Sequence, residues 1–162
     1  MNRTIYFNYI EEKLNTLAFR IEVRSKINLL ELNIHSENFF ACLCNIIFDL
    51  ELENLNFSHQ NIDGIDLIDR KNKIVVQVSS TCTKAKIESS LSKDVYTKYK
   101  DYNYKFMSIS KNASASLKNK NFQNPHSMKF DPKHDIWDVV LLLRIILNQT
   151  IYKQRKLYDF IK

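Results

Sequence analysis

The residues best placed to do chemistry lie in the middle of the chain, where a hairpin brings Asp66 and Gln77 together. The run 74–78 is short and rich in β-branched residues, which predicts a buried strand. The preceding run 62–69 alternates in polarity and predicts the partner strand. If 71–72 is a two-residue loop, counting back places Asp66 directly opposite Gln77. A slip of one residue would move Gln77 to the other face.

Two further residues extend this polar face of the hairpin. By the same count Ser79 lies opposite Gly64, because alternate side chains of a strand share a face. Cross-strand partners have Cβ atoms about 4.5–5.5 Å apart. A carboxylate, a carboxamide and a hydroxyl group therefore converge where the neighbouring residues are aliphatic.

Gln77 is the least expected residue of its strand. A buried carboxamide costs about 1–3 kcal/mol unless it is hydrogen-bonded, so Gln77 taken alone is more simply explained by a bond to a neighbouring loop. The alternative is contact with a metal ion or a phosphate. Asp66 favours that alternative, because a second polar group opposite indicates a functional site. Asp63 and Asp69 lie close enough in sequence to contribute, although solvated turn residues explain them more simply.

Other kinds of site lack their sequence patterns. The three cysteines form no C-x-x-C pair and the four histidines have no ligand spacing, so a structural zinc site is not expected. The single glycine excludes a phosphate-binding loop and a dinucleotide fingerprint. No G-x-S-x-G motif is present for a serine nucleophile.

Apolar periodicity predicts helices on both sides of the hairpin. Apolar residues recur at helical spacing in the first and last thirds of the chain, whereas short β-branched runs fill the centre. Asn33 or Ser36 is available to cap the second helix, and Trp137 is most simply a core residue. Helices are predicted at 4–27, 36–50, 84–100, 136–147 and 150–162, and strands at 52–57, 62–69, 74–78, 104–110 and 127–130.

Composition and charge indicate one soluble domain. The 162 residues include 1 Gly and 2 Pro, which disfavours turn-rich sandwiches. We expect an α/β domain with a small mixed central sheet of four to five strands flanked by helices. The formal net charge of +6 favours a polyanionic partner, although a solvated Lys-rich surface explains it equally well. The most apolar run, 139–147, is too short to cross a membrane, and no leader pattern is visible, so we expect a cytoplasmic protein.

In order along nearly the whole chain, several segments resemble the SMEK domain of bacterial proteins. That resemblance implies a single domain over 1–162, with a nuclease-like core at about 33–131 and helical flanks at 3–27 and 135–162. It also implies a setting of conflict with phage or mobile elements. The matching segments are 35–40 (HSENFF), 61–67 (NIDGIDL), 76–80 (VQVSS), 83–87 (TKAKI), 104–106 (YKF), 130–132 (FDP) and 135–138 (DIWD).

The SMEK pattern is itself similar to the PD-(D/E)xK restriction-endonuclease-like core. In that core a helix carboxylate, a strand aspartate and an acidic or Gln residue hold a divalent metal. The resemblance implies Glu37 as the helix carboxylate, Asp66 as the principal ligand and Gln77 as a neutral third ligand of Mg²⁺ or Mn²⁺. The metal would polarise the scissile phosphate and lower the pKa of the attacking water.

The sequence departs from this pattern two residues after the Gln, where the nuclease core has a catalytic Lys. This chain has Ser79 there. Lys84 or Lys86, at the start of the next predicted helix, would have to reach back and stabilise the developing negative charge.

Two hypotheses follow. The first is a metal-dependent nuclease acting on DNA, or on RNA; the second is an inactive nuclease-like module that binds nucleic acid or a partner protein of a defence system. The Tyr and Lys residues around position 100 would stack on bases or contact phosphates, or simply form a helix face. The terminal helices would bury Tyr152, Leu157 and Phe160 in a homodimer or in the chain's own core. The expected nucleic-acid contacts are Ser79, Lys98, Lys100 and Lys105.

Overall fold

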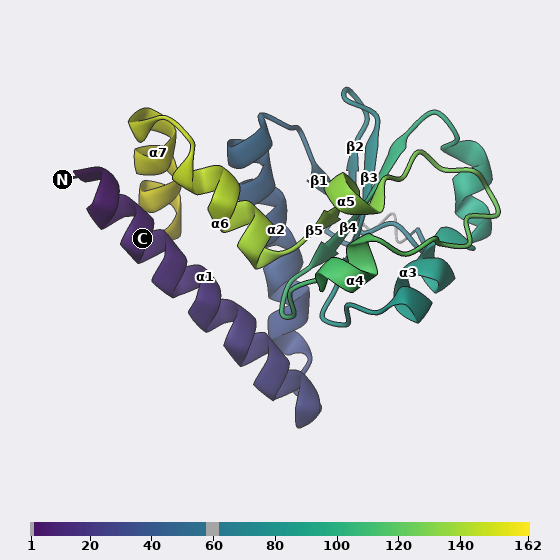
Figure 1. Cartoon of the computed structure of the whole chain (residues 1–162), viewed down its shortest axis with the longest axis horizontal. Helices are drawn as coiled ribbons and strands as arrows, with labels where there is room; N and C mark the ends of the chain where they lie inside the picture. Colours follow the sequence, from purple (N-terminus) through teal and green to yellow (C-terminus); the bar gives the residue numbers. More distant parts are fainter. Residues whose placement is uncertain (1, 58–61) are drawn as a thin grey trace.

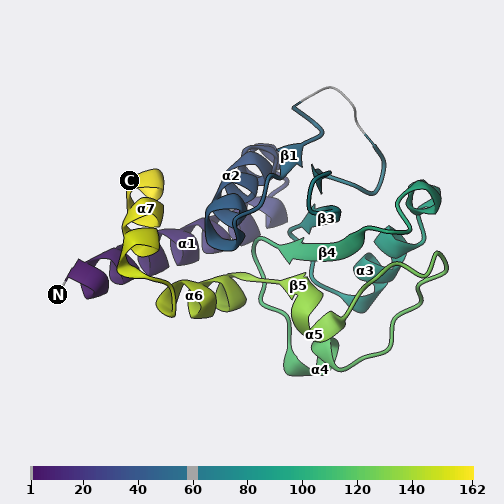
Figure 2. The ribbon, with the colours of Figure 1, turned by 90° about the horizontal axis from the view of Figure 1, so that it is seen from above.

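A five-stranded sheet lies between two helical layers (Figure 1). The computed structural model describes residues 2–57 and 62–162; Met1 and Asn61, the first residue of the SMEK-like segment 61–67, lie outside the described residues. Seen from above, α1, α2, α6 and α7 gather on one side of the sheet, and α3, α4 and α5 on the other (Figure 2). The predicted class, an α/β domain with a small mixed sheet flanked by helices, is confirmed.

The strands follow chain order across the sheet. Within the described residues the order is β1-β2-β3-β4-β5, and the pairs β1–β2 and β2–β3 are antiparallel. The pairs β3–β4 and β4–β5 are parallel, as is usual when a helix connects two strands. The strands span Glu53–Asn54 (β1), Leu67–Asp69 (β2), Ile74–Ser79 (β3), Asn103–Ser108 (β4) and Ile136–Trp137 (β5).

The predicted hairpin register is confirmed. Leu67 pairs with Val76, and Asp69 pairs with Ile74. One residue beyond the Leu67–Val76 pair, this register places Asp66 opposite Gln77. The backbone N–H of Asp66 donates to the Val76 carbonyl at 3.0 Å, which extends the pairing to the site. The strands separate beyond this point, and Ser79 pairs with Ser108 on β4.

Each face of the sheet has its own core. Val76 and Met107 pack toward α1, α2, α6 and α7, while Val75, Tyr104 and Phe106 pack toward α3 and the segments after it. The alternation follows from the two-residue period of a strand, and it places Gln77 on the α3 side. The helices span Asn2–Lys26 (α1), Glu31–Phe48 (α2), Lys84–Leu91 (α3), Ala115–Lys118 (α4), Pro132–Asp135 (α5), Val139–Leu147 (α6) and Ile151–Ile161 (α7), with a 3-10 helix η1 at Asp94–Lys98.

Two helix predictions need correction. The helix predicted at 36–50 begins at Glu31, and its N-cap is Leu30 without a side-chain bond; Ser36 lies inside the helix, where its hydroxyl donates to the Leu32 carbonyl. The helix predicted at 84–100 ends at Leu91 and continues after a break as η1.

The strand predictions were too long, and one lay in the wrong place. The runs 52–57 and 62–69 form strands only at 53–54 and 67–69. The edge strand predicted at 127–130 is a single bridge between Lys129 and Asn103. The edge strand β5 instead takes residues 136–137 from the predicted helix, which begins only after Asp138 caps α6 by accepting from Leu141 N–H at 2.7 Å.

The terminal helices pack on the rest of the chain. Leu157 of α7 is fully buried, and Phe160 stacks on Phe39 of α2 at 5.5 Å. Tyr152 is exposed. The intramolecular explanation therefore holds for Leu157. Among the described residues no helix is both long and apolar enough to span a membrane.

Candidate functional site

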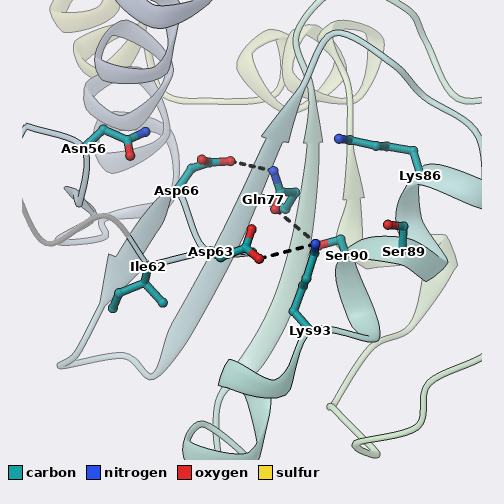
Figure 3. Close-up of a pocket in the computed structure, with 10 residues that line it drawn as sticks. Asn56, Ile62, Asp63, Asp66, Gln77, Lys86, Ser89, Ser90 and Lys93 are labelled. Atoms are coloured by element: carbon teal, nitrogen blue, oxygen red, sulfur yellow. Dashed lines mark hydrogen bonds and ion pairs between the residues drawn. The ribbon is translucent and has the colours of Figure 1, made fainter.

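A polar cavity of about 460 Å³ opens beside the end of the β2–β3 hairpin. Its walls come from the segment before β2, from β3, and from α3 with the turn after it. Figure 3 shows the side chains of these walls pointing toward one another. The lining residues are Asn56, Ile62, Asp63, Gly64, Asp66, Gln77, Lys86, Ser89, Ser90 and Lys93.

Asp66 and Gln77 form the centre of this cavity. The Gln77 amide nitrogen Nε2 donates to Asp66 Oδ2 at 2.8 Å, and the backbone N–H of Val78 donates to the same oxygen at 2.7 Å. Both bonds follow from the hairpin register, which places the carboxylate against the neighbouring strand. Both donors share Oδ2, which holds the carboxylate against β3 at the edge of the cavity.

A chain of donors fixes the direction of the Gln77 amide. The Tyr104 hydroxyl donates to Ser90 Oγ at 2.8 Å, and the Ser90 hydroxyl donates to Gln77 Oε1 at 3.4 Å. Burial raises the pKa of Tyr104 well above its ordinary value, so this hydroxyl stays protonated and acts as a donor. The amide oxygen therefore faces Ser90 and the amide nitrogen faces Asp66.

Glu37 joins the same network from α2 through Asn56. The Asn56 amide nitrogen donates to Glu37 Oε2 at 2.7 Å, and the Asn56 side chain also bonds the Asp66 carboxylate. The structure thus brings all three residues that the resemblance implied, Glu37, Asp66 and Gln77, into one hydrogen-bonded group. Asn56 is the connection that the sequence did not reveal.

Both carboxylates have raised pKa values. Burial is the main cause for Asp66, and it outweighs the bonds from Val78 and Asn56 and the nearby charge of Lys86. Burial also raises the pKa of Glu37, and the negative charge of Asp66 raises it further. Two partly desolvated carboxylates that repel each other are stabilised by a shared cation.

A divalent cation fits this group only in part. Asp66 and Glu37 offer hard oxygen ligands from two different elements, as Mg²⁺ or Mn²⁺ requires. Gln77 does not offer its oxygen in this orientation, because its nitrogen faces Asp66. In the described parts of the chain no group of three or more His, Cys, Asp or Glu side chains gathers as a metal site. A cation held here would take two carboxylates from the protein and fill its other positions with water or substrate.

Lysines of the α3 side supply positive charge. Lys86 and Lys93 line the cavity, and the amine of Lys86 points toward Gln77 in Figure 3. Lys84 lies two residues earlier on α3, pairs with Glu88 at 3.9 Å, and is not part of the lining. Of the two lysines expected to replace the missing motif Lys, the structure therefore brings only Lys86 to Asp66.

The expected nucleic-acid contacts lie elsewhere. Ser79 is nearly buried and its hydroxyl accepts from Thr81 N–H at 3.0 Å. The Lys105 amine forms a buried ion pair with Asp135. Lys98, in η1, and Lys100 are exposed and outside the cavity.

The two additional aspartates differ in role. Asp63 is exposed, lines the cavity and pairs with Lys93 at 3.4 Å. Asp69 is fully buried, so its explanation as a solvated turn residue is wrong; it accepts from the N–H groups of Glu51 and Asn72 at 2.8 Å each.

Four site residues escaped the sequence reasoning. Asn56 follows β1 in a segment predicted as strand, where no local signal marks it. Ser90 and Lys93 share helical spacing with Lys86, and that spacing was available in the sequence. Tyr104 was considered for base stacking, but it is fully buried beside Tyr96, so the fold explains both tyrosines.

Comparisons with known proteins give one match. A family model described as the SMEK domain matches residues 9–147, which is most of the chain and includes every residue of the cavity. No curated protein and no solved structure matches the chain.

Proposed function

This chain belongs to the SMEK domain family, and we propose that its cavity hydrolyses phosphodiester bonds of nucleic acid with the help of Mg²⁺ or Mn²⁺. The proposal includes kinship with the PD-(D/E)xK nucleases. One observation carries it: the two carboxylates Asp66 and Glu37, with raised pKa values, share a hydrogen-bonded group that faces a lysine across an open cavity. A structural ion-pair network would not leave its carboxylates short of positive charge.

Each residue has a distinct part in this proposal. Asp66 and Glu37 would hold the cation, which when bound polarises the phosphate and acidifies a water molecule. Gln77 orients Asp66 by donating to one of its oxygens. Lys86 provides the positive charge that the motif lysine supplies in the nuclease core, and so stabilises negative charge on the phosphate.

A second candidate is a module that binds nucleic acid or a partner protein without cutting. Two observations favour it. Ser79 replaces the motif lysine and its hydroxyl is engaged within its own turn, and the amide nitrogen of Gln77 occupies the side from which a third metal ligand would act.

Cleavage assays separate the two candidates. Supercoiled plasmid and single-stranded RNA are incubated with micromolar protein in Mg²⁺, Mn²⁺ or EDTA. We expect metal-dependent cleavage, with DNA the favoured substrate, that falls on the order of 100-fold or more in Asp66→Asn. Asp94→Asn, an exposed carboxylate outside the cavity, is the matched control and should keep its activity. If the wild type cuts neither nucleic acid with either metal, the binding module is the better account.

The biological setting is part of the same proposal. The family resemblance supports a role in defence against phage or mobile elements, acting in the cytoplasm and with a partner protein. A homodimer would place two cavities on one duplex and allow both strands to be cut. Light scattering of the purified protein with and without duplex DNA tests that arrangement directly.

A further inference from the structure

One face of α3 and of the turn after it carries two ammonium groups and a hydroxyl group. Lys86 and Ser89 are three residues apart on α3 and so share one side of the helix, and Lys93 follows in extended backbone in the turn after it. All three line the cavity. Lys84 belongs to the same helix but lies outside the lining and pairs with Glu88, so the cationic face is specific to this side.

The opposite wall of the cavity is acidic. Asp66 lines the cavity on the sheet side, and Glu37, which lies outside the lining, is joined to it through Asn56. The cavity therefore has two ammonium groups on its α3 side and the carboxylates of Asp66 and Asp63 on the other, with Lys93 and Asp63 forming an ion pair between them. A ligand that spans the cavity must present negative charge to α3. Beside Asp66 the same ligand must bind through a cation.

Lys93 is held in position by the segment that carries Asp66. An added Cβ on Gly64 would lie 2.8 Å from Lys93 Cγ, so the aliphatic stem of Lys93 packs directly against this glycine. The Lys93 amine pairs with Asp63 at 3.4 Å, but the Asp63 side chain is 85% exposed. Exposed ion pairs of this kind contribute little free energy, so a phosphate can replace Asp63 at small cost.

We infer that Lys86, Ser89 and Lys93 form a phosphate seat that binds one phosphate group of a nucleic-acid strand independently of any metal. Lysine ammonium groups and a serine hydroxyl are donors that suit phosphate oxygens. The identity of the ligand as nucleic acid rests on the proposed function, whereas the seat itself rests on the three side chains and the cavity. Binding releases counterions from the strand, which makes the affinity depend on salt.

The test measures binding without turnover. Fluorescence anisotropy of a labelled 12-nucleotide single-stranded DNA, and of the matching RNA, is recorded in EDTA across a range of salt concentrations. The double variant Lys86→Gln with Lys93→Gln keeps the packing stems and removes both charges. We expect roughly tenfold weaker binding and a salt dependence whose slope falls by about 0.7, because one phosphate contact is lost. Circular dichroism confirms the fold of each variant.

Two further variants sharpen the result. Lys84→Gln removes one charge from the same helix outside the cavity and should bind nearly as well as the wild type. Asp66→Asn removes negative charge from the opposite wall and should bind severalfold more tightly in EDTA. Loss of binding in Lys84→Gln equal to the loss in the double variant would show a diffuse Lys surface and would overturn the seat. Failure of the wild type to bind either strand would overturn it as well.

The outcomes also separate the seat from the proposed function. Metal-free binding that depends on Lys86 and Lys93, together with no cleavage in Mg²⁺ or Mn²⁺, supports the seat and contradicts the hydrolase. Metal-dependent cleavage with wild-type binding in the double variant supports the hydrolase and contradicts the seat.

Discussion

The β2–β3 hairpin contains two aspartates, Asp66 and Asp69, that are three residues apart and differ in every functional respect. Asp69 lies at the closed end, is fully buried, and accepts three hydrogen bonds from Glu51 and Asn72. Asp66 lies at the open end, where two of its donors share one oxygen. Burial raises the pKa of both carboxyls, but the surrounding N–H groups bring the pKa of Asp69 below its ordinary value while that of Asp66 stays raised.

The difference shows that burial alone does not identify a functional carboxylate. Asp69 has donors on both oxygens and needs no further partner, so it stabilises the turn. Asp66 is partly desolvated, and its donors from Gln77, Val78 and Asn56 do not offset the cost of burial, which favours binding of a cation or a proton. The direction of the pKa shift, raised at Asp66 and lowered at Asp69, separates the two residues where burial does not.

The largest expected effect is the loss of the structural aspartate. Asp69→Ala empties a fully buried position and removes the acceptor of the Glu51 and Asn72 N–H groups, so the free energy of unfolding should fall by about 3 kcal/mol. Urea denaturation measures this change. Asp101→Ala, an exposed carboxylate beside the same end of the sheet, should leave stability nearly unchanged. A small effect at Asp69 would remove the contrast between the two ends.

The next effect tests whether packing holds the open end of the hairpin. Gly64 has φ +95 and contacts Lys93, so Gly64→Ala combines backbone strain with a collision. We expect a loss of about 2 kcal/mol. Adding Lys93→Ala removes the contact with Cγ at 2.8 Å and leaves the contact with Cβ at 3.0 Å and the strain, so the double variant should recover part of the loss. No recovery in this double-mutant cycle would show that Lys93 does not constrain the loop.

A smaller effect tests the donor chain behind Gln77. Ser90→Ala removes the group between Tyr104 and Gln77, which should cost about 1 kcal/mol and free the amide to turn. Because Gln77 then donates less to Asp66, the pKa of Asp66 should rise further, as measured by carboxyl ¹³C NMR. Tyr104→Phe keeps the Ser90 donor and should move that pKa less. An unchanged Asp66 pKa in Ser90→Ala would contradict the orienting role.

The smallest effect is the opposite pH dependence of the two aspartates. The lowered pKa of Asp69 gives stability that is present above the ordinary Asp value of 3.8 and is lost as pH falls through the folded value. The raised pKa of Asp66 has the reverse sign, so its cost appears as pH rises from 3.8 through the folded value. Asp66→Asn should therefore gain about 0.5 kcal/mol at neutral pH and nothing below pH 3.8. Chemical denaturation at a series of pH values measures both slopes, and a constant gain would contradict the assignment.

The hairpin part of the site could be predicted because the position of the turn fixes which residues of the two strands lie opposite each other. Once 71–72 was taken as the loop, the partners of Asp66 and Ile74 followed from counting, and the structure pairs the strands in that register. The actual turn is longer, with Lys73 at φ 54, but the added turn residues leave the register unchanged.

The remaining parts depend on tertiary packing that no local pattern records. Asn56 reaches the site because the chain leaves β1 after Asn54, whereas the local sequence also permits a longer strand. Residues 136–137 were assigned to a helix because a short apolar run has no decisive period; pairing with β4 makes them a strand. Asp138, a good N-cap type at the start of α6, was the signal that could have corrected the boundary.

The single glycine of the chain has a consequence for how the sequence tolerates change. Among the described residues, Asn28, Asp49, Lys73 and Ser127 adopt positive φ of 51 to 63 without being glycine, whereas Gly64 has φ +95, which other residues rarely adopt. Gly64 is required for this backbone conformation and also because Lys93 fills the space that a side chain would occupy. In a saturation mutagenesis library, the four left-handed positions should accept glycine readily, whereas position 64 should reject nearly all other residues.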